Sequence, residues 1–567
     1  MFLSRRDFLR YSLSAGSTIW VSTQLSGCAL QGQEARLSSV SFTHGIASGD
    51  PEVSALILWT RAVPGEGTDV ATVGWEVAAD PQFSNIVRSG IATTGPERDY
   101  TVKVDVQELE SGTRYFYRFR GAEAVSDAGS SKTLPTGSVD RVRFAVFSCS
   151  NYPAGYFHAY GKAAQLPDID AFLHLGDYFY EYPSDGYATE RAAELGRELA
   201  EDNSGELLTL TDYRRRYALY RSDRDLQSLH AAAPMIAVWD DHEISNDTWH
   251  SGAQNHQPDE GPFEVRKAAA VQAYFEWMPI RPVVPDADGR IYRRMKFGDL
   301  VSLYMLDTRL IGRDQQLEFS HFIDEDTGEF DAASFTKAMS DPTRSMLGED
   351  QRLWLYGALQ ESQASWEVLG QQVLMARMQV PSAFLTSVFG KRDVASSQAL
   401  LEELVEDKRR ALAGEVLPKD RAQRLAMATP YNLDAWDGYA LERERLYGAL
   451  AAMDKTVVAF AGDTHNAWRS DLRDRNGRLA GVELATPGVS SPGMESYLSL
   501  DESSAALLSS AMVTLIDELQ YCDLTRRGFM EVEFTPSHCD TTWHFVDDVT
   551  RRDVAFTTET YRIERSA

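Results

Sequence analysis

The sequence has few cysteines and a deficit of positive charge, and it has no apolar stretch suited to span a bilayer: even its N-terminal segment is too short and too weakly hydrophobic for a permanent transmembrane helix. Four cysteines among 567 residues are too few for a disulfide scaffold, although Cys522 and Cys539 could pair in an oxidising compartment as readily as remain free. Lysine and arginine number 56 against 84 aspartates and glutamates, a formal charge of −28. This balance argues against a nucleic-acid-binding surface. It also means that a protein handling an anion such as phosphate needs a strong local cation, for example a metal ion.

The N-terminal segment, residues 1–27, is predicted to be a targeting signal and not part of the fold. Paired Arg5 and Arg6, followed by a mildly apolar stretch, resemble the twin-arginine export signal. Leu25-Ser26-Gly27-Cys28 resembles a bacterial lipobox, which would place a lipid on Cys28; cleavage without a lipid is the alternative. We therefore expect export through the twin-arginine machinery to the periplasm or the extracellular space, with membrane attachment if Cys28 is lipidated.

The remaining sequence changes character near residue 137. Residues 28–40 are predicted to be a linker, and residues 41–137 hold short alternating apolar runs separated by Gly, Pro and Asp turns. Such runs are typical of a small all-β sandwich of the fibronectin III or immunoglobulin type. Residues 140–567 alternate continuous apolar runs with helical stretches, which predicts an α/β layered domain, and residues 375–445 are predicted to be a mostly helical insertion.

Four of the apolar runs in the second region end in residues that can bind a metal. VRFAVF is followed by Cys149, DAFLHL by Asp177 and then Tyr180, APMIAVW by Asp240, Asp241 and His242, and TVVAFAG by Asp463 and His465. Functional groups gather beyond the carboxyl ends of strands in open α/β sheets. Singly, each has an ordinary explanation, such as a turn or helix cap for an aspartate and core packing for a cysteine. Their recurrence at equivalent points of four strands predicts a shared metal site.

The order SC…GDYFYEY…WDDHE…GDTH resembles the PhoD-like alkaline phosphatase/phosphodiesterase family, which belongs to the purple-acid-phosphatase-type metallophosphoesterases. FTHGIASGDPEVSALILWTRA resembles the sandwich domain of that family, and YRRRYALYRSD…LHAAAPMIAVWDDHE resembles its central block. The resemblance covers most of the chain. It implies a two-sheet α/β sandwich flanked by helices and preceded by a small β domain.

The resemblance also implies two kinds of metal, Fe³⁺ and Ca²⁺. By it, the ferric ion would be held by Cys149, Asp177, Tyr180 and His465. Asp177 would bridge to calcium, which would take further oxygen ligands from Asp463 and from either Asp241 or Asn246. The chemistry agrees, because calcium prefers oxygen ligands and a bound cation keeps a phenol or thiol ionised.

The expected activity is hydrolysis of phosphate mono- or diesters, in which the metals bind phosphoryl oxygens and lower the pKa of an attacking water. His242 is the candidate for stabilising or protonating the leaving oxygen, and support of a metal ligand is its alternative role. Arg216, or one of its neighbours Arg214 and Arg221, is the candidate clamp for a phosphoryl oxygen unless these side chains form a solvated helix face. Asp307 and Arg309, which follow the run VSLYML, are either site residues or a structural ion pair.

Other functions fit parts of the sequence. A phospholipase D-like activity on phospholipid or a cell-wall polymer would use the same metals. A non-enzymatic surface lipoprotein would show gaps in the ligand set, and this ligand set has none. An iron-dependent oxidoreductase is disfavoured because calcium would be the neighbouring ion.

Overall fold

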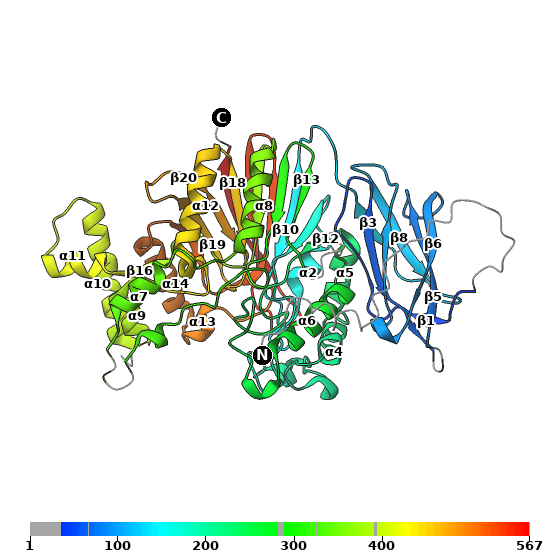
Figure 1. Cartoon of the computed structure of the whole chain (residues 1–567), viewed down its shortest axis with the longest axis horizontal. Helices are drawn as coiled ribbons and strands as arrows, with labels where there is room; N and C mark the ends of the chain where they lie inside the picture. The colour runs from blue at the N-terminus through cyan, green and yellow to red at the C-terminus, as the bar shows by residue number, and fades with distance from the viewer. Residues whose placement is uncertain are drawn as a thin grey trace.

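The computed structural model describes residues 36–565 apart from 66, 68, 282–288, 325–326, 328 and 390–393. The predicted signal peptide and Cys28 lie outside these residues, so export and lipidation stay predictions. None of the helices in the described part of the chain is long and apolar enough to cross a membrane. In Figure 1 the β-rich N-terminal region (blue) lies at one end of the molecule, and a helical arm (yellow-green) projects from the other.

Two large sheets form the main body. Within the described residues, the first sheet has the strand order β24 (Phe556–Glu564), β23 (His538–Val546), β22 (Arg527–Phe534), β10 (Val142–Phe147), β11 (Ala171–His174), β12 (Met235–Ala237), β2 (Ile46–Gly49), β3 (Leu56–Arg61) and β7 (Thr101–Val106). The second has the order β13 (Arg293–Phe297), β14 (Val301–Met305), β15 (Trp366–Gly370), β18 (Val457–Ala461), β20 (Leu479–Ala485), β19 (Ala467–Arg473) and β21 (Leu519–Asp523). Strands β10, β11 and β12 are parallel, as are β14, β15, β18 and β20.

The buried side chains of the second sheet alternate between two cores. Leu303 and Phe460 contribute to the core that also contains Phe144 and Phe534 of the first sheet, and therefore face that sheet. Tyr304 belongs to the other core, which the helices on the outer face cover. Because successive strand residues point to opposite faces, a strand with both faces buried must be a continuous apolar run. The predicted α/β layered fold of two sheets is confirmed.

Helices that contact strands of the two large sheets are α2 (His158–Ala163), α5 (Arg224–Ala232), α6 (Phe263–Trp277), α12 (Ala440–Met453) and α14 (Glu502–Leu515). The other α-helices outside the arm are α3 (Ala192–Leu195), α4 (Leu210–Tyr220), α7 (Ala332–Met339), α8 (Gly348–Glu361) and α13 (Met494–Tyr497). The arm consists of α9 (Ser382–Phe389), α10 (Val394–Leu412) and α11 (Lys419–Ala426), bracketed by the paired strands β16 (Gln379–Pro381) and β17 (Ala428–Pro430). The mostly helical insertion is therefore confirmed. Helix α14 packs against β21, α10 and β16.

The N-terminal region is a two-sheet sandwich that shares a sheet with the main body. Its outer sheet has the order β6 (Ile86–Thr94), β5 (Ala71–Ala78), β8 (Arg114–Arg120) and β9 (Gly129–Lys132), and a short pair, β1 (Val40–Ser41) and β4 (Val63–Pro64), lies beside it. The inner sheet, β2-β3-β7, continues into the main body because β2 pairs with β12 at Gly49 and Met235. On β3, Leu58 faces the sandwich core, whereas Trp59 joins the core of the main body. The sequence analysis did not predict this continuity.

The structure shows whether Cys522 and Cys539 form a disulfide or remain free thiols. Cys522 on β21 and Cys539 on β23 are both buried free thiols, and so is Cys149. The described residues therefore contain no disulfide between Cys522 and Cys539.

Candidate metal centre

The predicted ligands meet where the carboxyl ends of both parallel strand sets come together. Cys149 follows β10, Asp177 follows β11, Asp241 follows β12, and Asp463 and His465 follow β18. An isolated parallel bridge between Ser148 and Gly488 joins the end of β10 to the segment after β20, so the edges of the two sheets are in contact. The backbone N–H of Cys149 donates to the carbonyl of Gly176 at 3.2 Å, which continues the β10–β11 pairing into the site.

Four of these residues adopt a backbone conformation that non-glycine residues rarely use. The φ angles are 60° for Cys149, 55° for Asp177, 63° for Asp463 and 60° for His465. Such conformations cost about 1–3 kcal/mol each, and they persist where the surrounding structure over-determines them, as at functional sites. The strand ends therefore turn sharply, and each turn aims a polar side chain at the same point.

Gly176 is needed for the approach of two strand ends. Its φ is 113°, and a Cβ atom there would lie 2.3 Å from the Cβ of Asp240 and 2.4 Å from the Asp240 nitrogen. The carboxylate of Glu243 fastens the same two ends, because it accepts hydrogen bonds from the N–H groups of Asp177 at 3.0 Å, Tyr178 at 2.7 Å and Asp240 at 2.8 Å. This contact fixes Asp177 beside the acidic segment that follows β12.

The first ligand group combines a thiol, a carboxylate and an imidazole. Potential ligand atoms of Cys149, Asp177 and His465 all lie within 4.8 Å of one another, and all three residues are buried. The Tyr180 hydroxyl lies 3.0 Å from Oδ2 of Asp177 and 2.9 Å from Nε2 of His465. His465 Nδ1 lies 2.5 Å from the carbonyl oxygen of Pro492, so Nδ1 carries the proton and the lone pair of Nε2 faces the group.

The second ligand group shares Asp177 with the first. Potential ligand atoms of Asp177, Asp241 and His242 also lie within 4.8 Å of one another. The Oδ1 atom of Asp177 is buried and has no hydrogen-bond partner among the residues that the structure describes. A buried carboxylate oxygen without a partner is costly, and a cation between the two groups would satisfy it.

Asp463 and Asn246 lie at the margin of these groups. The Asp463 side chain is 20% exposed, and its Oδ1 lies 3.6 Å from Nη2 of Arg309. The Asn246 side-chain amide donates to Oε1 of Gln254 at 3.0 Å, and its backbone N–H donates to Glu181. Asp241, and not Asn246, therefore has its side chain in a ligand group, although the choice between them as the direct calcium ligand stays a prediction.

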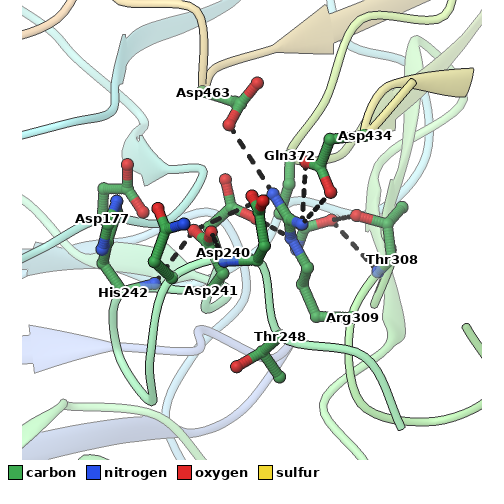
Figure 2. A network of polar contacts seen from close by, with 12 residues as sticks. Asp177, Asp240, Asp241, His242, Thr248, Thr308, Arg309, Gln372, Asp434 and Asp463 are labelled. Atoms are coloured by element: carbon green, nitrogen blue, oxygen red, sulfur yellow. Dashed lines mark hydrogen bonds and ion pairs between the residues drawn. The ribbon is translucent and has the colours of Figure 1, made fainter. Parts of the chain in front are cut away.

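The guanidinium at the site is that of Arg309, which follows β14 (Figure 2). It is fully buried, and its Nε donates to Asp240 while Nη1 lies 2.9 Å from Oδ2 of Asp434. Within the described part of the chain its Nη2 has no hydrogen-bond partner, and it lies 3.8 Å from Oδ1 of Asp241 and 3.6 Å from Oδ1 of Asp463. Arg309 is therefore a site residue, and its predicted structural ion pair with Asp307 is not formed: Asp307 accepts the backbone N–H of Arg309 instead.

The three predicted phosphate-clamping arginines have other partners. Arg216 is buried on α4 and donates to the backbone carbonyls of Tyr180 and Tyr182, so it supports the loop behind the ligands. Arg214 forms a paired contact with Glu276 at 2.6 Å, and Arg221 is buried 4.2 Å above the Trp59 ring. These contacts correct the sequence-based assignment, because none of the three guanidinium groups is brought to the ligand groups.

Burial and neighbouring carboxylates raise the pKa values of the site carboxyls, whereas Arg309 and His242 lower them. Burial, reinforced by neighbouring Asp240 and Asp241, raises the pKa of Asp177 well above its usual value. Burial also raises the pKa of Asp240 to about 6, against the lowering effect of Arg309. For Asp241, burial acts upward, but Arg309 and His242 outweigh it and the pKa falls. Arg309 and His242 therefore neutralise only part of the negative charge of these carboxylates.

His242 has a partner that the sequence analysis missed. Its Nδ1 lies 2.7 Å from Oε2 of the fully buried Glu181, which also accepts from the Asn255 amide at 2.9 Å. Burial lowers the pKa of His242, but the carboxylates of Asp241 and Glu181 outweigh it and raise the pKa well above its usual value. The motif YFYEY contained the signal, since a carboxylate sits beside a ligand tyrosine. Asp434 gave no such signal, because it lies in a loop after the helical arm.

Comparisons with known proteins agree with this geometry. The family model for PhoD-like phosphatases matches residues 144–543, and the model for the N-terminal domain of PhoD-like phosphatases matches residues 27–135. The chain is 33% identical over 512 residues to alkaline phosphatase D of Bacillus subtilis (strain 168), covering 86% of this chain and 76% of that protein.

The chain belongs to the PhoD-like phosphatase family. A solved structure described as the structure of PhoD is similar with a TM-score of 0.73 and 29% identity, covering 94% of this chain and 92% of that chain. This membership makes the chain a phosphoesterase, and it confirms the family resemblance seen in the sequence. Membership of the family implies metal dependence, and the two ligand groups described above could each hold a metal ion.

Replacing Arg309 tests the charge balance of the site. Arg309→Gln should lower the free energy of unfolding by about 3–5 kcal/mol, because it leaves the buried Asp240 without its counter-ion, whereas Asp434 keeps its ion pair with Arg313. The control is Arg562→Gln, which breaks a two-bond contact with Asp540 at 2.6 Å on an exposed strand and should change stability far less. Urea unfolding in the presence of a chelator measures both. Equal losses in the two variants would contradict the charge-balance argument.

Proposed function

We propose that this family member is an exported phosphoesterase that hydrolyses phosphate mono- or diesters at a centre of iron and calcium. The observation that carries the proposal is the position of the Asp177 carboxylate, which belongs to both ligand groups. A carboxylate shared in this way suits two adjacent cations, and paired cations are the usual catalytic centre for displacement at phosphorus.

The donor atoms support a different metal in each group. A thiol, an imidazole and a phenol, from Cys149, His465 and Tyr180, suit a transition metal such as Fe³⁺. Asp241 and Asp463 offer only oxygen, which calcium prefers, and Asn246 is the alternative oxygen donor. Burial raises the pKa values of the Cys149 thiol and the Tyr180 phenol well above their usual range, so a bound cation is needed to ionise them.

The chain's own residues would orient the substrate and move one proton. When bound, the cations would neutralise the phosphoryl oxygens and acidify an attacking water. Glu181 holds the Nδ1 side of His242, so Nε2 of His242 faces the second ligand group and can donate a proton to the leaving oxygen. Arg309, whose Nη2 lacks a partner, would fix the orientation of Asp241 and Asp463 from behind.

The location and the natural ester are also proposals. Paired Arg5 and Arg6 favour export through the twin-arginine pathway, and Cys28 is the expected lipid attachment point. Phosphate scavenging outside the cytoplasm fits these signals. A phospholipase D-like activity on phospholipid or cell-wall polymer is the alternative, because the same residues would serve a diester.

Hydrolysis and metal content together test the proposed function. The purified protein should contain iron and calcium and should hydrolyse 4-nitrophenyl phosphate, bis(4-nitrophenyl) phosphate or both, with activity lost on chelation and restored by the two metals. Elemental analysis and release of nitrophenol measure these quantities. A protein that contains no iron, or that hydrolyses neither ester when fully loaded, would refute the proposal.

Tyr180→Phe tests the iron ligand independently of activity. A phenolate bound to Fe³⁺ should give the protein a visible absorption band, and Tyr180→Phe should remove it. The matched control is Tyr178→Phe, because the Tyr178 hydroxyl is bonded to His230 at 2.8 Å and lies outside the ligand groups; its spectrum should be unchanged. A band that survives in Tyr180→Phe, or disappears in Tyr178→Phe, would exclude Tyr180 as the ligand.

A further inference from the structure

Three tyrosines outside the ligand set form a continuous aromatic wall beside His242 and His465. The ring of Tyr182 has its centroid 5.4 Å from that of His242 and 5.7 Å from that of Tyr187. Tyr187 in turn lies 5.5 Å from the ligand candidate Tyr180. The wall, Tyr182–Tyr187–Tyr497, thus begins beside the candidate proton donor.

Tyr497 carries the wall out to the surface. Its ring lies parallel to that of Tyr187, with centroids 6.1 Å apart and an interplanar angle of 9°, and its hydroxyl donates to the Tyr187 hydroxyl at 2.8 Å. The residue is nevertheless 61% exposed. Exposure of a large ring is unusual where burial was available, and ring faces that border a site are suited to stacking with a ligand ring.

The short helix that bears Tyr497 is held in place by polar contacts. Arg527 forms an ion pair with Glu495 of α13 and donates to the backbone carbonyl of His465 at 3.1 Å. The N–H of Met494 donates to Oδ1 of Asn466 at 3.2 Å. The wall is therefore positioned by the same segment that carries the metal ligand His465.

We propose that the aromatic wall is the subsite for the leaving group, and that it favours phosphate esters whose alcohol carries an aromatic ring, such as a phenol or a nucleoside. The inference rests on the proposed function, because the leaving oxygen would depart on the side of His242. A ring attached to that oxygen would reach Tyr182 and Tyr187 first and Tyr497 last. The three side chains of the wall offer π faces and hydroxyl groups and carry no charge, and the nearby Arg527 is already paired with Glu495, so the wall suits a neutral ring and not a second phosphate.

Hydrolysis of three esters by Tyr497→Ala tests the subsite. For phenyl phosphate and for adenosine 5′-monophosphate, KM should rise about tenfold, as expected for loss of one stacking contact. For ethyl phosphate, KM should stay within about twofold, because its alcohol is too small to reach Tyr497. A separate variant, Tyr497→Phe, should keep the wild-type KM for the aromatic esters, because it retains the ring and removes only the hydroxyl contact with Tyr187. The control variant is Leu479→Ala. Leu479 is an exposed residue at the amino end of β20, so its replacement should leave KM unchanged for all three esters.

The possible outcomes separate the subsite from the proposed function. An increase in KM for ethyl phosphate as large as that for the aromatic esters would overturn an aromatic subsite. So would an equally large increase for hexyl phosphate, a further substrate whose alcohol is long and apolar but not aromatic. If KM rose for only one of phenyl phosphate and adenosine 5′-monophosphate, the subsite would be supported for that class of aromatic ester. If the wild-type protein hydrolysed no ester, the proposed function would fail. The subsite would then be judged by calorimetry: adenosine 5′-monophosphate should bind more tightly than inorganic phosphate, and Tyr497→Ala should abolish that preference. No preference in the wild-type protein would overturn it.

Discussion

Buried carboxylates at one edge of the two sheets are the constraint on which the site depends. Asp177, Asp240 and Asp241 are each at most 3% exposed, and the ends of β11 and β12 are locked together by Gly176 and Glu243. Buried charge without compensation is expensive. Arg309 compensates Asp240, but Oδ1 of Asp177 keeps no partner. The fold thus gathers buried carboxylates at one edge of the two sheets, and bound cations would match their remaining charge.

The same arrangement connects the metal centre to substrate recognition. The turns after β18 carry Asp463 and His465 in left-handed backbone conformations, and His465 is tied through Pro492 and Arg527 to the segment that bears Tyr497. A change at His465 would therefore be transmitted to the aromatic wall. Under the proposals made above, this coupling would give the substrate a neutral surface for its alcohol while bound cations would hold its phosphate.

Much of this site was predictable because its ligands follow buried strands. Cys149, Asp177 and His465 follow continuous apolar runs, and parallel strands bring such ends to one edge. The residues that hold these side chains in place were harder to predict from the sequence. Arg309 follows an apolar run and was a candidate, but its partner Asp434 lies 125 residues away in a loop with no local signal. Arg216 resembled a phosphate clamp by composition, but the helix turns its side chain inward to backbone carbonyls, and helix phase cannot be read from three consecutive arginines. The sheet shared with the N-terminal sandwich rests on one residue pair, Gly49 and Met235, too slight for a sequence signal.

The central claim is that Asp177 joins two metal sites, and the metal content of single variants tests it most directly. Elemental analysis per chain should show that Cys149→Ser loses iron and keeps calcium, that Asp241→Asn loses calcium and keeps iron, and that Asp177→Asn loses both. Asp177→Asn protein that retained either metal at the wild-type stoichiometry would contradict the account.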